Sequence, residues 1–279
     1  MPKARAPLMP VEDALASILA AANPITETET VSLLNALGRV LATDQVSAVD
    51  VPPCDNSAMD GYVIRHIDLA SDELAVSQRI PAGHMGSPLI AGTAARIFTG
   101  AAIPDNADTV VMQEDTEVVG DTIRVTADIK LGQHIRPKGQ DISSGSVVIA
   151  KGNRLAPQDI GLLASVGATH VEVLRSLKVA VLSTGDELVE PGKPLAPGQI
   201  YNSNRYTLSA LLAAMGYEVI DGGIVADDFD LTYQQLEAMA DAADIIISSG
   251  GVSVGEEDHV KAAVESLGEL GLWKLNIKP

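Results

Sequence analysis

Cysteine and basic residues are scarce in this chain of 279 residues. The single cysteine, Cys54, excludes an internal disulfide and a multi-cysteine zinc site, and it fits a reducing, cytoplasmic compartment. Lys and Arg number 19 against 37 Asp and Glu, which gives a formal net charge of −18. Nucleic acids and anionic membranes bind basic surfaces, so we expect neither as a partner. Anionic small molecules remain compatible with this charge, because a divalent cation or a few lysines can reverse the local field.

Long apolar runs and two common catalytic motifs are also missing. No segment approaches the roughly 20 apolar residues that span a bilayer. The chain has neither a Gly-x-Ser-x-Gly elbow nor a Walker loop, which argues against a serine hydrolase and a P-loop enzyme. Apolar residues near the N-terminus have helical spacing and are interrupted by acids, which predicts an amphipathic helix rather than a signal peptide: Val11, Leu15, Ile18 and Leu19.

The first two thirds of the chain predict a β-rich block between helical segments. A capping-box pattern from Thr26 to Glu29 predicts a second helix that ends at Gly38. Short β-rich runs and many turn residues then predict a small all-β domain, residues 46–141. Helical spacing returns at 157–166. We therefore expect a discontinuous, elongated helical domain, residues 1–45 and 142–174, with the all-β domain inserted into it.

The last third, residues 175–279, predicts a doubly wound α/β domain. A nearly continuous apolar run at 177–183 is typical of a parallel strand covered on both faces. Helices and strands alternate after it, with strands expected at 217–224, 245–248 and 273–277. Such alternation indicates a parallel sheet with helices on both sides. The predicted fold class is thus multidomain, α/β and β.

Glycines and acids gather where ligands bind in open α/β sheets, beyond the carboxyl ends of the strands. Three loops carry them: Ser183-Thr-Gly-Asp-Glu187, then Gly222-Gly223 with Asp227-Asp228, then Ser248-Ser-Gly-Gly-Val-Ser-Val-Gly-Glu-Glu-Asp258. In one loop, turn geometry and helix capping explain such residues. Three loops at one edge favour a phosphate and metal site instead, because carboxylates are ligands for Mg²⁺ and glycines allow close approach.

Several motifs together resemble the MoeA family, the molybdopterin molybdenumtransferases that include the gephyrin E domain. They are Asp55-Asn-Ser-Ala-Met-Asp-Gly-Tyr62, Gly139-Gln-Asp-Ile142, Ser183-Thr-Gly-Asp-Glu-Leu188, Ser248-Ser-Gly-Gly-Val-Ser-Val-Gly255 and Trp273-Lys-Leu275. The resemblance covers the whole chain in the right order. It implies a helical domain, an inserted β domain and a MogA-like, molybdopterin-binding α/β domain, in agreement with the organisation above.

The resemblance also implies a reaction in molybdenum cofactor biosynthesis. The family is expected to insert molybdenum from molybdate into adenylylated molybdopterin, with Mg²⁺ and with release of AMP. It also implies a homodimer whose active site lies between the α/β domain of one subunit and the β domain of the other. A molybdopterin adenylyltransferase is a further partner that this pathway suggests.

The resemblance carries functional residues to matching positions of this sequence. Catalytic positions are Asp60, Glu187, Asp227, Asp258, Lys274 and Lys278, of which the four acids are the predicted Mg²⁺ ligands and the lysines would attract molybdate or phosphate. Cofactor-binding positions are Thr99, Ser183, Thr184, Gly185, Ser249, Gly250, Gly251 and Ser253.

Two other functions compete with this assignment. An adenylyltransferase shares the α/β domain, but it would lack the first 175 residues and their Asp60 motif. A non-catalytic scaffold dimer would have no reason to keep the four acids. The family continues past the lysine-proline step that ends at Pro279. We therefore expect a truncated form, part of a longer protein, or a shortened gene product, whose activity without the missing part is open, as is a preference for molybdate over tungstate.

Overall fold

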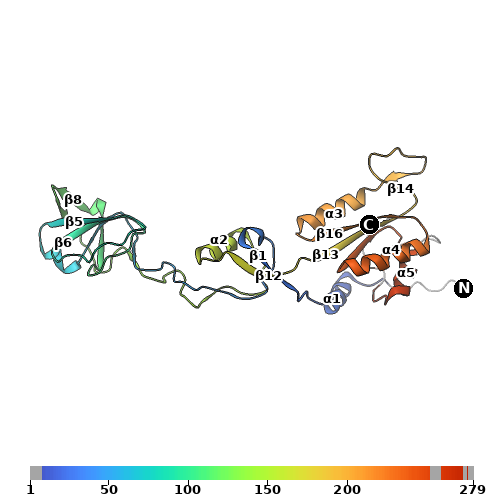
Figure 1. The fold of residues 1–279 in the computed structure, drawn as a ribbon, viewed down its shortest axis with the longest axis horizontal. Coiled ribbons are helices and arrows are strands. Elements are labelled where there is room, and N and C mark those ends of the chain that lie inside the picture. Colours follow the sequence, from blue (N-terminus) through green and yellow to red (C-terminus); the bar gives the residue numbers. More distant parts are fainter. Residues whose placement is uncertain (1–7, 252–258, 273–274, 276–279) are drawn as a thin grey trace. The chain divides into compact units, whose positions relative to one another are not determined.

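The computed structural model describes residues 8–251, 259–272 and 275, and its contacts divide the chain into two compact units. The α/β unit comprises Met1–Glu29 and Val173–Pro279, and the β unit comprises Thr30–Glu172 (Figure 1). The domain bounds expected from the sequence remain a prediction. No helix in the described residues is long and apolar enough to cross a membrane.

A three-stranded parallel sheet forms the centre of the α/β unit, in the order β16-β13-β17. Its strands are β13 (Lys178–Thr184), β16 (Glu218–Val225) and β17 (Ile245–Ser249). The helices are α1 (Val11–Ala21), α3 (Ser203–Ala214), α4 (Phe229–Ala242) and α5, described over His259–Leu267. A separate parallel pair joins β14 (Leu188–Val189) to β15 (Ile200–Tyr201). The predicted doubly wound α/β fold is confirmed.

Side-chain alternation along β13 explains why helices cover both faces of this sheet. Val179 and Val181 pack with Leu212 of α3, whereas Leu182 packs with Leu236 of α4 and with a residue of α5. Successive residues of a strand point to opposite faces, so an apolar run needs a cover on each side. Accordingly α3 lies on one face, and α4 and α5 lie on the other (Figure 1).

A bulge in β16 accounts for the double glycine that the sequence placed after the second strand. Val181 pairs with Asp221 and Ser183 with Ile224, so two residues of β16 oppose one of β13. Those two residues, Gly222 and Gly223, lie inside the strand, which agrees with the strand predicted at 217–224; their assignment to the loop after it is wrong. A Cβ on Gly222 would lie 2.9 Å from the carbonyl oxygen of Val181, and Gly223 has a φ of +71°. Both positions therefore need glycine.

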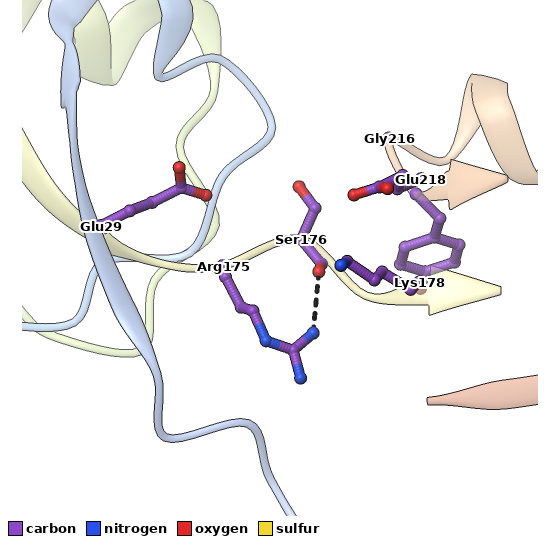
Figure 2. A pocket seen from close by; sticks show the side chains of 7 residues that line it. Glu29, Arg175, Ser176, Lys178, Gly216 and Glu218 are labelled. Carbon is purple, nitrogen blue, oxygen red and sulfur yellow. Dashed lines mark hydrogen bonds between the residues drawn. The ribbon is translucent and has the colours of Figure 1, made fainter. Parts of the chain in front are cut away.

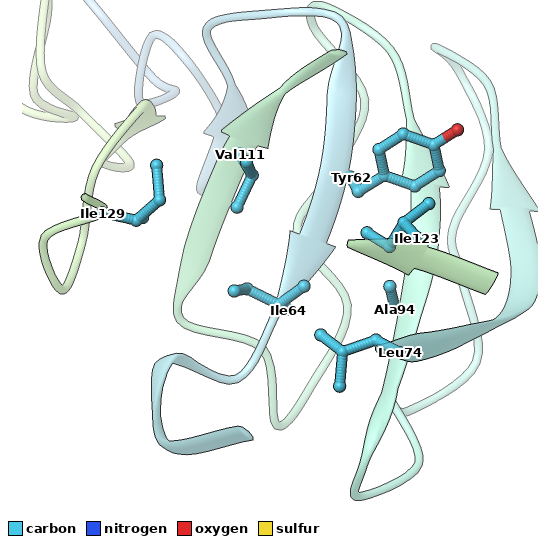
Figure 3. Packing of buried hydrophobic residues seen from close by; sticks show 7 residues of the cluster. All are labelled: Tyr62, Ile64, Leu74, Ala94, Val111, Ile123 and Ile129. Atoms are coloured by element: carbon cyan, nitrogen blue, oxygen red, sulfur yellow. The ribbon is translucent and has the colours of Figure 1, made fainter. Parts of the chain in front are cut away.

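The β unit contains a six-stranded mixed sheet in the order β7-β4-β6-β5-β9-β8. Its strands are β4 (Gly61–Ile64), β5 (Leu74–Ile80), β6 (Thr93–Ile97), β7 (Thr109–Met112), β8 (Thr116–Val119) and β9 (Thr122–Val125). Both faces carry buried apolar side chains. One cluster comprises Tyr62, Ile64, Leu74, Ala94, Val111, Ile123 and Ile129 (Figure 3), and the other includes Val63, Ile80, Ala95, Ile97 and Val110. The predicted β-rich block is confirmed.

Shorter elements complete the described chain. Three further strand pairs are present: β3 (Asn56–Ser57) with β10 (Ile135–Arg136), β2 (Gln45–Val46) with β11 (Val147–Ile149), and β1 (Thr28–Ser32) with β12 (His170–Leu174). The remaining helices are α2 (Pro157–Ser165) and the 3-10 turns η1 (Leu33–Asn35), η2 (His66–Ala70) and η3 (Gln113–Asp115). The helix predicted at 157–166 is therefore confirmed as α2.

The second helix predicted from Thr26 to Gly38 is wrong. Strand β1 and the single turn η1 occupy that segment. Thr28, Thr30 and Val31 are β-branched, which favours an extended chain, and β12 supplies the pairing partner. A capping-box pattern is local, and the partner strand lies about 140 residues away, so tertiary pairing overrode the local signal. The strand predicted at 273–277 lies mostly outside the described residues; its Leu275 forms a parallel bridge with Met9.

Candidate functional site

The carboxyl ends of β13 and β17 meet at one edge of the α/β sheet, where Ser183 pairs with Ser249. Thr184, the last residue of β13, is buried, and its hydroxyl oxygen has no hydrogen-bond partner in the described part of the chain. Leaving a buried hydroxyl unpaired costs free energy. The predicted role of Thr184 in cofactor binding stays a prediction, and an unpaired hydroxyl at this edge has the acceptor and donor capacity that such a role would need.

The glycine pair after β17 lies against Thr184. A Cβ on Gly250 would lie 2.4 Å from the carbonyl oxygen of Thr184, and one on Gly251 would lie 2.6 Å from its hydroxyl oxygen. Both glycines have positive φ, +98° and +64°. Glycine is thus required here for close approach of two chain segments. The structure explains these glycines through Thr184, and their predicted contact with a cofactor stays a prediction.

Two loops at this edge exchange hydrogen bonds through their acids. The backbone N–H of Asp186 donates to Oδ2 of Asp227, and the N–H of Asp227 donates to Oδ1 of Asp186, both at 3.2 Å. The carboxylate of Glu187 folds over Gly185, where an added Cβ would lie 2.2 Å from Oε2. The structure therefore brings Asp227 to the loop that carries Gly185 and Glu187. Sequence reasoning missed Asp186, although it stands inside the quoted Thr-Gly-Asp-Glu motif.

Two of the three predicted serines of this edge, Ser183 and Ser249, contact the start of α3. The hydroxyl of Ser183 donates to Oδ1 of Asn202 at 3.4 Å, and that oxygen also accepts the N–H of Arg205, which caps the helix. The side chain of Asn204 donates to the hydroxyl of Ser249 at 2.9 Å. Both asparagines escaped sequence reasoning; Asn202 carries the signal of an N-cap. These serines therefore position α3 beside the edge.

The β unit brings together Asp60 and Thr99. The backbone N–H and the hydroxyl of Thr99 both donate to Oδ1 of Asp60, each at 2.8 Å. These two hydrogen bonds, with the positive charge of Arg96 as a smaller cause, hold the pKa of Asp60 below its ordinary value of 3.8. The carboxylate is therefore ionised at neutral pH, and its second oxygen faces no donor that the structure records. The structure thus brings the two residues together, and the roles predicted for them in metal and cofactor binding stay predictions.

The residue after Asp60 must be glycine. A Cβ on Gly61 would lie 1.9 Å from the carbonyl oxygen of Val111 in the neighbouring strand β7. The backbone N–H of Gln113 donates to the carbonyl oxygen of Asp60 at 3.1 Å, and Arg96 donates to that of Gly61 at the same distance. Arg96 of β6, Val111 of β7 and Gln113 of η3 thus fix the backbone from which the Asp60 side chain projects.

Four predicted site residues, Ser253, Asp258, Lys274 and Lys278, lie outside the described residues. Within residues 8–251, 259–272 and 275, no group of three or more His, Cys, Asp or Glu side chains gathers closely enough to hold a metal ion. Asp60 belongs to one compact unit and Glu187 and Asp227 to the other. The four-acid metal site thus stays a prediction.

Two cavities of similar size lie in the α/β unit. One, of about 490 Å³, is at the amino ends of β13 and β16, opposite the edge described above (Figure 2). Its lining mixes both charges and comprises Glu29, Arg175, Ser176, Lys178, Gly216, Tyr217 and Glu218. The other has a volume of about 480 Å³. It is lined by the residues directly after Glu187 and by two residues further along the chain: Leu188, Val189, Glu190, Lys193, Arg205 and Ile224. The lining of the second cavity combines apolar residues with two cations and one acid, and Arg205 forms an ion pair with Glu190 there.

Known families match both parts of the chain. Residues 9–167 match the family described as MoeA N-terminal region (domain I and II), and residues 180–279 match a probable molybdopterin binding domain. A protein of Haemophilus influenzae named molybdopterin molybdenumtransferase is 45% identical over 91% of this chain and 64% of its own length. One of the same name from a Nostoc strain is 42% identical over 87% of this chain and 57% of its own length. The chain thus spans about three fifths of the length of these relatives.

Solved structures agree with this assignment. The molybdopterin biosynthesis MoeA protein of Pyrococcus horikoshii superposes with a TM-score of 0.81 and 36% identity, over 88% of this chain and 67% of that one. The first family match covers nearly all of the β unit and the residues from 9 that precede it, and the second covers the α/β unit from residue 180 onward. The chain belongs to the MoeA family.

Proposed function

We propose that this chain takes part in inserting molybdenum into molybdopterin, with adenylylated molybdopterin and molybdate as substrates, Mg²⁺ as cofactor and AMP as a product. The carrying observation is the Asp60–Thr99 pair, which holds an ionised carboxylate at the motif that the family resemblance singled out. The names of the relatives support the molybdopterin substrate. The homodimer and the cytoplasmic location expected from the sequence remain part of this proposal.

The donor atoms of the predicted acids suit Mg²⁺. Asp60, Glu187 and Asp227 offer carboxylate oxygens, the ligands this ion prefers, and the lowered pKa of Asp60 keeps that carboxylate charged. Bound Mg²⁺ would neutralise charge on the phosphoanhydride of the substrate. Thr99 would orient Asp60, since both of its donors fix a single oxygen and leave the other for binding.

The α/β edge would hold the pterin or its phosphates. The unpaired hydroxyl of Thr184 and the backbone of Gly250 and Gly251 converge there. Asn202 and Asn204 hold α3 beside this edge through Ser183 and Ser249. The protein would thus supply hydrogen bonds and orientation, the main contributions of a protein to a transfer between bound small molecules.

Replacement of Asp60 tests the proposal. In Asp60→Asn, the rate of AMP release from adenylylated molybdopterin in the presence of molybdate and Mg²⁺ should fall by about 100-fold or more, as when a preorganised catalytic charge is lost. Asp121→Asn is the matched control, because it removes an exposed acid from a turn of the same unit and should keep the wild-type rate. Equal rates in wild type and Asp60→Asn would remove Asp60 from the site.

A further inference from the structure

Two arginines meet on one face of the six-stranded sheet. Arg79 of β5 and Arg96 of β6 are direct partners in the strand register. Their guanidinium carbons lie 4.5 Å and 4.8 Å from the ring centroid of Phe98, so both stack on the same ring. Arg96 also lies 5.1 Å from the ring of Tyr62, its partner on β4. Stacking on aromatic rings keeps two like charges side by side.

A β-bulge brings the arginines to the same face. Val76 pairs with Ala94 and Gln78 with Ala95, so Ser77 is an extra residue in β5. If β5 continued from Val76 in regular register with no bulge, side-chain alternation would place Arg79 beside Ile97, on the opposite face. The hydroxyl of Ser77 donates to the carbonyl oxygen of Ala94 at 3.1 Å and thereby holds the bulge. Bulges commonly redirect a side chain in this way near functional sites.

Neither guanidinium is paired with an acid in the described part of the chain. Arg96 donates to the carbonyl oxygen of Gly61 at 3.1 Å and to Oε1 of Gln113 at 2.7 Å, both neutral acceptors. Arg79 is exposed and makes only the stacking contact that the structure records. Other arginines do form ion pairs with carboxylates: Arg65, Arg124, Arg136, Arg175 and Arg205. Adjacent unpaired cations are unusual in a chain with nearly twice as many acids as bases.

We propose that Arg79 and Arg96 bind a phosphoryl group carried by a small organic ligand. Guanidinium groups present paired N–H donors that match the oxygens of a phosphate monoester, and two forks stacked on one ring are already oriented for it. Phe98 directly precedes Thr99, whose hydroxyl donates to Asp60, so the bound group would lie near Asp60 in space. The Asp60 carboxylate is directed to Thr99 and forms no recorded ion pair with Arg96.

Binding of phosphate to the free protein tests this site without turnover, so its result is independent of the proposed reaction. Isothermal titration with inorganic phosphate at low ionic strength should show binding to the wild type that is weaker by about tenfold or more in Arg79→Gln. The side chain of Arg79 forms no hydrogen bond recorded among the described residues, so Arg79→Gln should fold as the wild type does. Arg96→Lys keeps the charge but removes the fork, and it should weaken binding as well.

Arg124→Gln is the matched control, since it removes one positive charge from strand β9 of the same sheet, where Arg124 pairs with Glu73 and Glu117. It should bind phosphate as the wild type does. Phenyl phosphate, a monoester, should displace inorganic phosphate from the wild type and lose affinity in Arg79→Gln. Absence of phosphate binding, equal losses in Arg79→Gln and Arg124→Gln, or failure of phenyl phosphate to displace phosphate would each overturn the proposal.

Discussion

Thr99 gives both its backbone N–H and its hydroxyl to one oxygen of Asp60, at 2.8 Å each. Two donors on a single carboxylate oxygen stabilise the charged form and fix the orientation of the group. The other oxygen keeps its acceptor capacity. Thr99, just after strand β6, thus positions the charged group of Asp60, the residue before β4, in the motif on which the proposed function depends.

Thr99→Ala should raise the pKa of Asp60 towards its ordinary value of 3.8, because the hydroxyl donor is lost while the backbone donor remains. The carboxyl carbon resonance of Asp60, followed by NMR as a function of pH, measures this shift. Thr99→Ser keeps the hydroxyl and should retain the low pKa. An unchanged pKa in Thr99→Ala would show that the hydroxyl does not contribute.

Gly61→Ala should destabilise the β unit by about 3 kcal/mol or more, because its Cβ would overlap the carbonyl oxygen of Val111 at 1.9 Å. Gly161→Ala is the matched control, since Gly161 lies in helix α2 with no atom within 4 Å of the added Cβ. It should stabilise the protein by about 0.5–1 kcal/mol. Urea unfolding of both variants gives the comparison, and similar destabilisation of both would contradict the close approach.

Asp244 should make the free energy of unfolding depend on pH in the acidic range. Hydrogen bonds from Arg175, then from the backbone of Lys178, hold the pKa of Asp244 at about 2, against an ordinary value of 3.8. The folded state therefore binds the proton more weakly than the unfolded state does, and the stabilisation is complete above about pH 4 and lost as the pH falls towards 2.

The free energy of unfolding, measured from pH 5 to pH 2, tests this dependence. The difference between wild type and Asp244→Asn should shrink as the pH falls through this range. The same difference measured in an Arg175→Met background should be smaller throughout, since Arg175 is the larger cause of the shift. A difference that stays constant with pH would contradict the role of Asp244.

Thr184→Val should keep or slightly raise the free energy of unfolding, because the buried hydroxyl it removes has no partner among the described residues. It should nevertheless weaken binding of molybdopterin, if that hydroxyl serves the ligand. Thermal unfolding and equilibrium binding of the pterin measure the two effects separately. Wild-type affinity in Thr184→Val would show that the hydroxyl does not contact the ligand.

Periodic patterns in the sequence predicted the α/β unit well. The apolar run of β13 and the helical spacing of α3 and α4 are local signals that burial on two faces reinforces. The helix predicted at 26–38 failed because β1 depends on its pairing with β12, which no local pattern reveals. The same holds for the bulge that contains Gly222 and Gly223, which is visible only in the register with β13.

The candidate site was predictable in its residues but less so in their contacts. The motifs pointed to Asp60 and Thr99, and the structure joins them. Asp186, Asn202 and Asn204 were missed because their roles arise from hydrogen bonds to Asp227, Ser183 and Ser249 in distant parts of the chain. The bulge that sets Arg79 beside Arg96 is likewise a property of strand pairing.

The most direct test of the proposed function measures AMP and pterin-bound molybdenum together, after the protein is mixed with adenylylated molybdopterin, molybdate and Mg²⁺. The proposal predicts equal amounts of the two products, formed only when molybdate is present, and greatly reduced amounts of both in Asp60→Asn. An adenylyltransferase would instead make adenylylated molybdopterin from ATP and molybdopterin. That product, or AMP release without molybdenum incorporation, would contradict the proposal.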